Sequence, residues 1–168
     1  DAIEALRANL IDVAVVTSPF ADKTGLNINV IKKLQDIVAA GNGFSYLKDK
    51  EISLHELVKY PLICLKNTTT TRNYLDHIFR QHNLLLRPDI ELTSINFVMP
   101  MVKNNLGIGF MQYATTKAEI EAGNIFRVNT KEQIPPRSIC AVTASQYETP
   151  EPVQRFIDSL LEKESVNI

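Results

Sequence analysis

The chain has 168 residues, 45% of them hydrophobic and 22% charged, which excludes a disordered, collagenous or coiled-coil protein. Its formal net charge is −1 and its pI about 6.4, whereas a domain that grips nucleic-acid phosphates by itself is usually basic. No apolar run approaches the roughly 18 residues that a membrane span needs, and the first residues lack the pattern of a signal peptide.

The first 43 residues predict one helix followed by strands. Apolar residues on helical spacing indicate a helix over residues 2–8, which Asn9 ends in the left-handed conformation. Thr17, Ser18 and Pro19 then close the first strand with turn chemistry. The strands are expected at residues 11–16, 26–30 and 34–40.

The middle of the chain carries two helix starts. Ser53 and Glu56 form a capping box that begins a short helix. Four threonines, Thr68 to Thr71, separate an expected strand at residues 62–65 from a helix over residues 72–83. The apolar stripe of that second helix is Leu75, Ile78, Phe79 and His82.

The last third continues the alternation of strands and helices. Ser94 can cap a helix that Asn105 ends, and Pro100 inside it predicts a kink or an irregular first turn. A short helix over residues 115–122 has Gly123 just past its end. The final helix starts at residues 149–150 with a core-facing stripe of Val153, Phe156, Ile157, Leu160 and Leu161. Further strands are expected at residues 90–93, 107–111, 125–128 and 138–143.

This alternation predicts an α/β fold with largely parallel strands. A parallel sheet normally feeds each helix from a strand, so a chain that begins on a helix is expected to start inside a domain. The cysteines, Cys64 and Cys140, lie in apolar runs. Such runs are typical of buried thiols in a reducing compartment.

Motifs for catalysis, cofactors and metals are missing from the sequence. Gly107 and Gly109 lie in or before a strand, which is the wrong context for a dinucleotide loop. His77 and His82 are five residues apart, which is about 500° of helical turn, so their rings do not share a face suited to a metal. No catalytic residue, metal ligand or cofactor is therefore predicted, although an acid/base pair assembled only in three dimensions stays possible.

The threonine run is the most informative feature of the sequence. It lies between a strand and a helix, and ligands of open α/β sheets bind beyond the carboxyl ends of strands. Free N–H groups at the helix start, together with hydroxyls, would hold a carboxylate or sulfate without a lysine. The alternative is a polar loop that supplies only a helix cap.

Two other segments have the same order of strand, polar residues and helix or turn. They are residues 16–19, which include Thr17 and Ser18, and residues 93–96, which include Ser94 and Asn96. Each alone is typical of a cap or a turn. Together with the threonine run, they suggest the rims of one cleft.

The order of motifs resembles that of LysR-type transcriptional regulators. Residues 6–15 (LRANLIDVAV) are similar to the family's leucine, glycine, leucine-aspartate-leucine-alanine-isoleucine segment, and residues 53–63 (SLHELVKYPLI) to its leucine, aspartate-leucine, proline-isoleucine segment. Thr70-Thr71-Arg72 matches the polar loop and arginine that follow. Residues 91–102 with 105–109 (NLGIG for the latter) resemble the valine, glycine-x-glycine-isoleucine segment.

Three departures from the family pattern stand out. Asn9 and Asn105 replace expected glycines, and asparagine is the next best residue for a left-handed conformation. Gln112 stands where the family usually has proline, which could alter the pocket rim. The winged helix-turn-helix, the linker helix and the first β–α–β unit of the effector domain have no counterpart, so an N-terminally truncated regulatory domain is expected.

The resemblance implies a two-lobed fold similar to type 2 periplasmic binding proteins, with two hinge crossings and the first β–α–β unit missing. Lobe I would be residues 1–32 with 126–168, and lobe II residues 33–125. A small, anionic or polar effector would bind in the inter-lobe cleft. The motif match carries over as effector contacts Thr69, Thr70, Thr71, Thr17, Ser18, Ser94 and Asn96, while Arg72 either reaches the anion or points outward.

The resemblance also implies a homodimer or tetramer in the cytoplasm, with DNA bound only through an N-terminal domain outside this chain. Effector binding would move the lobes through its differential affinity for two arrangements. A missing first unit would expose a sheet edge, which favours a dimer or a swapped assembly. The alternatives are a solute-binding protein of a transport system and an enzyme on the same scaffold, because fold resemblance alone does not decide function.

Overall fold

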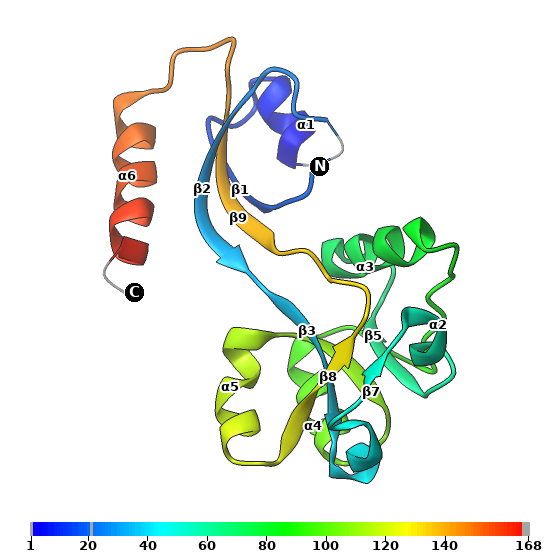
Figure 1. Cartoon of the computed structure of the whole chain (residues 1–168). Coiled ribbons are helices and arrows are strands. Elements are labelled where there is room, and N and C mark those ends of the chain that lie inside the picture. The colour runs from blue at the N-terminus through cyan, green and yellow to red at the C-terminus, as the bar shows by residue number, and fades with distance from the viewer. Residues whose placement is uncertain (1, 21, 166–168) are drawn as a thin grey trace. The chain divides into compact units, whose positions relative to one another are not determined.

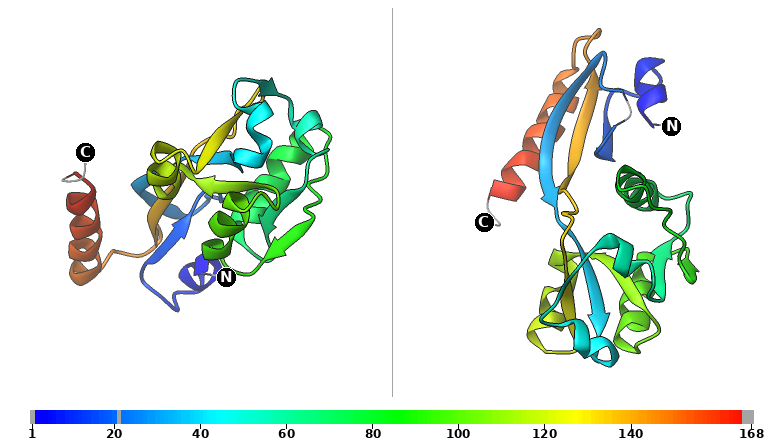
Figure 2. Two further views of the ribbon diagram at one scale, coloured as in Figure 1. Left: turned by 90° about the horizontal axis from the view of Figure 1, so that it is seen from below. Right: turned by 45° about the vertical axis from the view of Figure 1, so that its right-hand side comes forward.

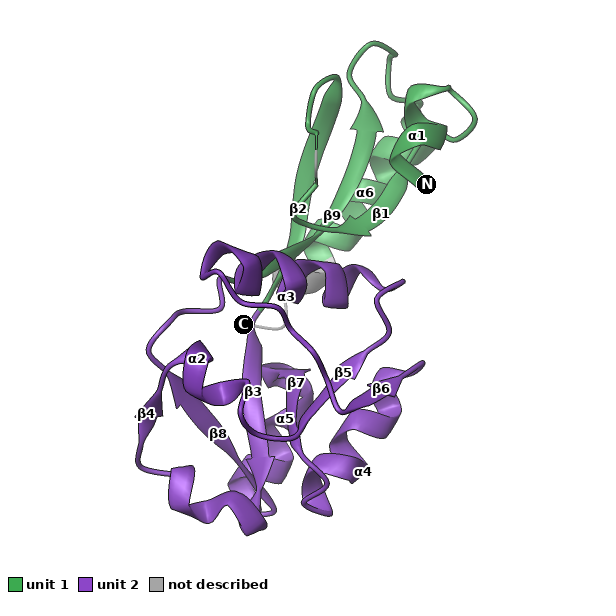
Figure 3. Ribbon diagram, turned by 90° about the vertical axis from the view of Figure 1, so that its right-hand side faces the viewer, with its two compact units in different colours: residues 1–34, 136–168 green, residues 35–135 purple. Residues whose placement is uncertain are grey.

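The computed structural model describes residues 2–20 and 22–165, so both ends of the expected lobe I lie outside the described residues. The chain divides into unit 1, residues 1–34 and 136–168, and unit 2, residues 35–135 (Figures 1 and 3). It passes between the units after Leu34 and again after Pro135. The second passage comes later than the expected change at residue 125, because residues 125–130 form a strand of the unit 2 sheet.

Unit 1 is built on a three-stranded antiparallel sheet in the order β1–β9–β2. The strands are β1 (Ala14–Thr17), β2 (Leu26–Leu34) and β9 (Arg137–Ala144). Helix α1 (Ala2–Arg7) buries Leu6 against Ala14, Cys140 and Val142. Helix α6 (Glu151–Ser165) lies alongside β2 (Figure 2).

Unit 2 contains a six-stranded mixed sheet in the order β4–β8–β3–β7–β5–β6. The central strand β3 is antiparallel to both β7 and β8, whereas β5 is parallel to β6 and β7, and β4 is parallel to β8. The expectation of largely parallel strands is therefore wrong, because β3 enters directly from unit 1 without a crossover helix. The bounds are β3 (Asp36–Gly41), β4 (Glu51–Ile52), β5 (Leu62–Leu65), β6 (Ile90–Leu92), β7 (Ile108–Gln112) and β8 (Ile125–Thr130).

Helices cover both faces of this sheet. Val38 and Ala40 of β3 face a core shared with α2 (Leu54–Leu57) and α3 (Thr70–Gln81). The alternate residues of β3 face a second core with α4 (Val98–Lys103) and the end of α5 (Tyr113–Glu121). Gly109 allows α4 to approach, since a Cβ there would lie 2.7 Å from a Val102 methyl carbon. Two 3-10 turns complete the unit, η1 (Asn42–Leu47) and η2 (Ile95–Phe97).

The expected helix ends are confirmed. Asn9 has φ 55°, and the amides of Leu10 and Asn9 bond to the carbonyls of Ala5 (2.9 Å) and Leu6 (3.0 Å), which closes α1 around a left-handed residue. The same pattern of positive φ and paired bonds ends α3, α4 and α5 at Asn83, Asn105 and Gly123.

Of three other local expectations, two are confirmed and one is confirmed only in part. The Ser53–Glu56 capping box is present in both of its bonds. Pro100 lies in the first turn of α4, which is preceded by η2, so the irregular start predicted from the proline is confirmed. The stripe of α6 is only partly core-facing, because Ile157 is buried while Phe156 stays 43% exposed.

Candidate functional site

The threonine run of unit 2 forms the turn between β5 and α3. Thr69 is the N-cap: its hydroxyl accepts from the Arg72 amide (3.2 Å) and donates to the Lys66 carbonyl (2.8 Å). The Thr69 side chain therefore serves the loop itself. The helix-cap interpretation left open by the sequence is therefore confirmed at Thr69, which begins a 12-residue helix, while the anion-site interpretation stays a prediction.

The next two threonines occupy the first turn of α3. Thr70 is exposed, and its hydroxyl has no hydrogen-bond partner within residues 2–20 and 22–165. Thr71 is half-buried and already engaged within the protein. The start of an α-helix carries partial positive charge from its aligned peptide dipoles, so Thr70 lies where a negative group is stabilised.

Arg72 is neither on the helix surface nor available to an anion. It is 6% exposed, and its guanidinium donates to Asp76 (2.9 Å) and Glu91 (2.7 Å), and to the carbonyls of Leu65 and Leu86 (both 3.1 Å). Burial acts to lower the pKa of Arg72, but the hydrogen bonds to the two carboxylates outweigh it and raise that pKa. Arg72 thus links α3 to β5, to β6 and to the segment at Leu86 through hydrogen bonds of its buried guanidinium.

Ser94 and Asn96 lie beside the threonine loop at the same edge of the sheet. They follow β6, which runs parallel to β5, and the Lys66 amide donates to the Leu92 carbonyl (2.9 Å) just where both strands end (Figure 3). The Ser94 hydroxyl accepts from the Asn96 amide at 3.4 Å, a long bond. The carboxyl ends of two neighbouring parallel strands therefore bring two of the three predicted rims together within unit 2.

The third rim belongs to unit 1. Thr17 ends β1 opposite Ile139, and Ser18 follows it. The Ser18 hydroxyl accepts from the Ser138 amide (2.8 Å), while the Ser18 amide donates to the Ser138 carbonyl (2.8 Å). Ser18 thereby extends the pairing of β1 with β9, and among the described residues its hydroxyl proton has no acceptor.

Other kinds of site find little support. The described residues hold no group of three or more histidine, cysteine or acidic side chains that could ligate a metal. Within the same residues no helix combines the length and the apolar character needed to traverse a bilayer. Cys64 and Cys140 are free and buried, as the sequence predicts. Burial raises the pKa of the Cys64 thiol to about 12, so this thiol is not poised as a nucleophile.

Sequence reasoning missed the internal role of Arg72. Its partner Asp76 is on the same helix face four residues on, a spacing that signals a helical ion pair. Glu91, Leu65 and Leu86 come from other elements, and their convergence has no signal in the order of residues.

The comparisons with known proteins agree with this geometry. A family model described as the LysR substrate binding domain matches residues 1–165. The chain belongs to this family. It is a family of transcription-regulator domains and not of enzymes.

One curated relative is the HTH-type transcriptional activator CmpR of Synechocystis sp., which is 29% identical over 111 residues, or 65% of this chain. The match covers 36% of CmpR, so the LysR-family chain spans about a third of that relative's length.

Solved structures show the same fold. The CcmR regulatory domain of Synechocystis, solved with 2-PG, has a TM-score of 0.78 at 18% identity, covering 97% of this chain and 78% of that one. The effector-binding domain of QuiR, solved with shikimate, gives 0.74 at 18% identity, covering 98% and 77%. The effector-binding domain of a BenM variant gives 0.71 at 16% identity, covering 99% and 76%. The chain therefore has the α/β, periplasmic-binding-protein-like fold of LysR effector-binding domains.

Proposed function

We propose that this LysR-family domain binds a small anionic or polar metabolite at the start of α3. The observation that carries the proposal is the meeting of the α3 N-terminus with the Ser94 turn at the carboxyl ends of β5 and β6. Ligands of open α/β sheets bind at such edges. Two similar structures were solved in complex with shikimate and with 2-PG, both small molecules, which supports this class of effector.

The chemistry of recognition follows from the residues at this edge. Thr70 offers an exposed hydroxyl at the positive end of the helix, and Ser94 and Asn96 offer a hydroxyl and an amide beside it. Arg72 does not compete for the anion, because Asp76 and Glu91 already hold its charge. The site thus selects by hydrogen-bond geometry more than by net charge.

Thr69 and Thr71 complete the proposed unit 2 contacts, and Thr17 and Ser18 those of unit 1. Thr69 acts by fixing the loop, as its two bonds support. A hydroxyl in the position of Ser18 can donate to an effector while it accepts from the Ser138 amide. Substitutions made separately in the two units test whether unit 1 contributes to effector binding.

We also propose that the domain acts within a longer, cytoplasmic regulator that is a homodimer or tetramer and binds DNA through a separate N-terminal domain. Its membership of the LysR family and the similarity to CmpR support this context. Effector binding would control DNA binding only if the effector has different affinities for two arrangements of the protein.

Calorimetric titration of 2-PG and shikimate tests the proposed site. We expect one of these probes to bind, and the double variant Thr70→Val/Thr71→Val to weaken that binding about tenfold, through the loss of hydroxyl hydrogen bonds. Thr115→Val is the matched control, because Thr115 is an exposed threonine in the first turn of α5 in the same unit. Unchanged affinity in the double variant would show that the threonine assignment is wrong.

The unit 1 assignment has its own pair of variants. Thr17→Val and Ser18→Ala should each weaken the binding of the same probe if unit 1 contributes. Equal affinity in both variants would confine the site to unit 2.

A further inference from the structure

The second passage between the units lacks the usual means of backbone attachment. Residues 133–136 belong to no helix or strand, and Pro135 and Pro136 have no amide hydrogen to donate. The backbone of these two prolines can therefore accept hydrogen bonds but not donate them. Side chains of unit 2 reach two carbonyls of this stretch just before the chain enters unit 1.

Two side chains do so through neighbouring carbonyls. The Gln35 side-chain amide donates to the carbonyl of Ile134 (3.1 Å), and the Tyr74 hydroxyl donates to the carbonyl of Pro135. Gln35 is the first residue of unit 2, so its bond joins the two passages of the chain. Tyr74 comes from α3, and both it and Pro135 belong to unit 2.

Helix α3 therefore has fixed contacts near both the loop and the passage. At its start, Thr69 caps it, and Arg72 binds it to the ends of β5 and β6. Tyr74 follows Thr70 by four residues, which places the two on one face of the helix. Tyr74 is 8% exposed, so its ring is held within the unit 2 core.

We infer that Tyr74 is a positioning residue that couples the start of α3 to the second passage between the units. A change at the threonine loop moves or steadies α3, and the Tyr74–Pro135 bond passes that change to the segment that enters unit 1. This inference rests on the proposed function for its biological meaning. The coupling itself is a property of the ligand-free protein.

A double-mutant cycle of Thr69→Ala and Tyr74→Phe tests the coupling without a ligand. Thr69→Ala loosens the start of α3, and Tyr74→Phe removes one hydroxyl while it keeps the ring. The first readout is the exchange rate of the Ser138 amide, which has a hydrogen-bond partner just beyond the passage. The second is the ¹³C chemical shift of the Pro135 carbonyl, a direct reporter of its hydrogen bond.

We expect Tyr74→Phe to shift the Pro135 carbonyl resonance. It should also speed exchange of the Ser138 amide about fivefold, which corresponds to the net contribution of one ordinary hydrogen bond to stability. Thr69→Ala should speed Ser138 exchange about twofold or more when Tyr74 is present and leave it unchanged in the Tyr74→Phe background. Tyr46→Phe, which removes an exposed hydroxyl in the same unit, should leave both readouts unchanged.

Two results would overturn the inference. One is a Pro135 carbonyl shift that Tyr74→Phe does not alter. The other is an effect of Thr69→Ala on Ser138 that has the same size in both backgrounds. Global melting curves of each variant show whether any change is simple unfolding.

A second arm adds saturating 2-PG or shikimate and separates this inference from the proposed function. In the unmodified chain, a bound probe should slow exchange at the Arg72 amide and at Ser138, and in Tyr74→Phe at Arg72 alone. If neither probe affects Arg72, the proposed site fails while the cycle still decides the coupling. If Ser138 responds fully in Tyr74→Phe, the coupling through Tyr74 is wrong.

Discussion

The two units bury their sheets to very different extents. All six residues of β3, the central strand of unit 2, are buried, because helices cover both faces of that sheet. In unit 1 the central strand β9 is largely buried, but β1 and β2 are both outer strands with exposed positions such as Val15 and Val30. Folding removes more apolar surface from water in unit 2 than in unit 1. Unit 2 therefore contributes the larger share of the favourable free energy of folding.

This difference indicates which parts of the protein are rigid and which open more easily. Segments with few buried apolar contacts open with lower free energies than core strands do. The proposed effector loop and α3 belong to the well-packed unit, whereas β1 and its Ser18 belong to the thinly packed one. Three comparisons between matched residues of the two units and one pH-dependence experiment on the buried thiol of unit 2 test this contrast, and they are ordered by the size of the expected effect.

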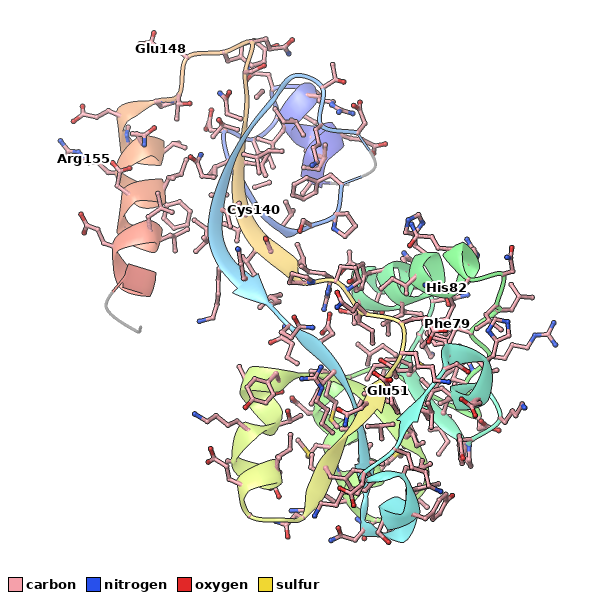
Figure 4. The ribbon with its side chains drawn as sticks, viewed as in Figure 1. Glu51, Phe79, His82, Cys140, Glu148 and Arg155 are labelled. Atoms are coloured by element: carbon pink, nitrogen blue, oxygen red, sulfur yellow. The ribbon has the colours of Figure 1, made fainter. Side chains whose placement is uncertain are left out.

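Phenylalanine truncation should show the largest difference. Phe79, labelled in Figure 4, is fully buried in the unit 2 core. It packs edge-to-face on Phe110. Phe79→Ala should lower the free energy of unfolding by about 3–5 kcal/mol. Phe156→Ala on α6 should cost less than about 1 kcal/mol because that ring is half-exposed. Urea unfolding measures both, and equal losses would contradict the contrast.

Arginine substitution should come next. Arg72→Met leaves Asp76 with a nearly buried charge and two carbonyls without their donor, so we expect a loss of about 2–4 kcal/mol. Arg155 pairs with Glu151 on the exposed surface of α6, and Arg155→Met should change stability by less than about 0.5 kcal/mol. If urea unfolding shows that Arg72→Met leaves the free energy of unfolding unchanged, Arg72 stabilises the fold through side-chain packing alone and not through its hydrogen bonds.

The buried thiol of unit 2 should make stability depend on alkaline pH. The pKa of Cys64 is raised by burial to about 12, above its value near 8.5 in an unfolded chain. The folded state therefore keeps its proton where the unfolded state loses it, and this stabilisation is present below the unfolded pKa and is lost as pH rises from about 9 to 12. Urea unfolding at pH 8 and 10 should show a decline that Cys64→Val reduces by about 1–2 kcal/mol. An equal decline in Cys64→Val would contradict the prediction.

Asparagine-to-glycine changes should give the smallest effects, and of opposite sign. Both Asn9 and Asn105 have positive φ, which glycine adopts without strain. Asn105→Gly also removes the side-chain oxygen that accepts from the Gly43 amide at 2.6 Å, so a net loss of about 1 kcal/mol is expected. Asn9→Gly in unit 1 should be neutral or stabilising by a few tenths of a kcal/mol. Thermal unfolding measures the two, and stabilisation by Asn105→Gly would show that this hydrogen bond contributes little.

Local features of the fold were predictable because neighbouring residues decide them. The Ser53 cap, the left-handed Asn9 and Asn105, and the irregular turn before Pro100 are each set within a few residues of chain. The same holds for the buried thiols, which apolar neighbours in sequence indicate. The threonine loop and Ser94 lie after strands, as the sequence predicts, and the parallel pairing of β5 with β6 brings them to one edge. Their role as effector contacts stays a prediction.

Strand direction and the boundary of the units were not predictable in this way. Residues 125–130 have the pattern of a buried strand, but only their pairing with β3 assigns them to unit 2. The partner of a strand is chosen by contacts far apart in sequence, and a hydrophobic pattern reads the same for a parallel or an antiparallel neighbour.

The sequence by itself determined the family, the α/β class and the polar segments that end its strands, because these are properties of local pattern and of motif order. Only the tertiary structure decided what each side chain is free to do. Arg72 is held by groups from three other segments, and Tyr74 reaches a carbonyl 61 residues away. Hydrogen bonding depends on distance in space, and folding alone sets that distance.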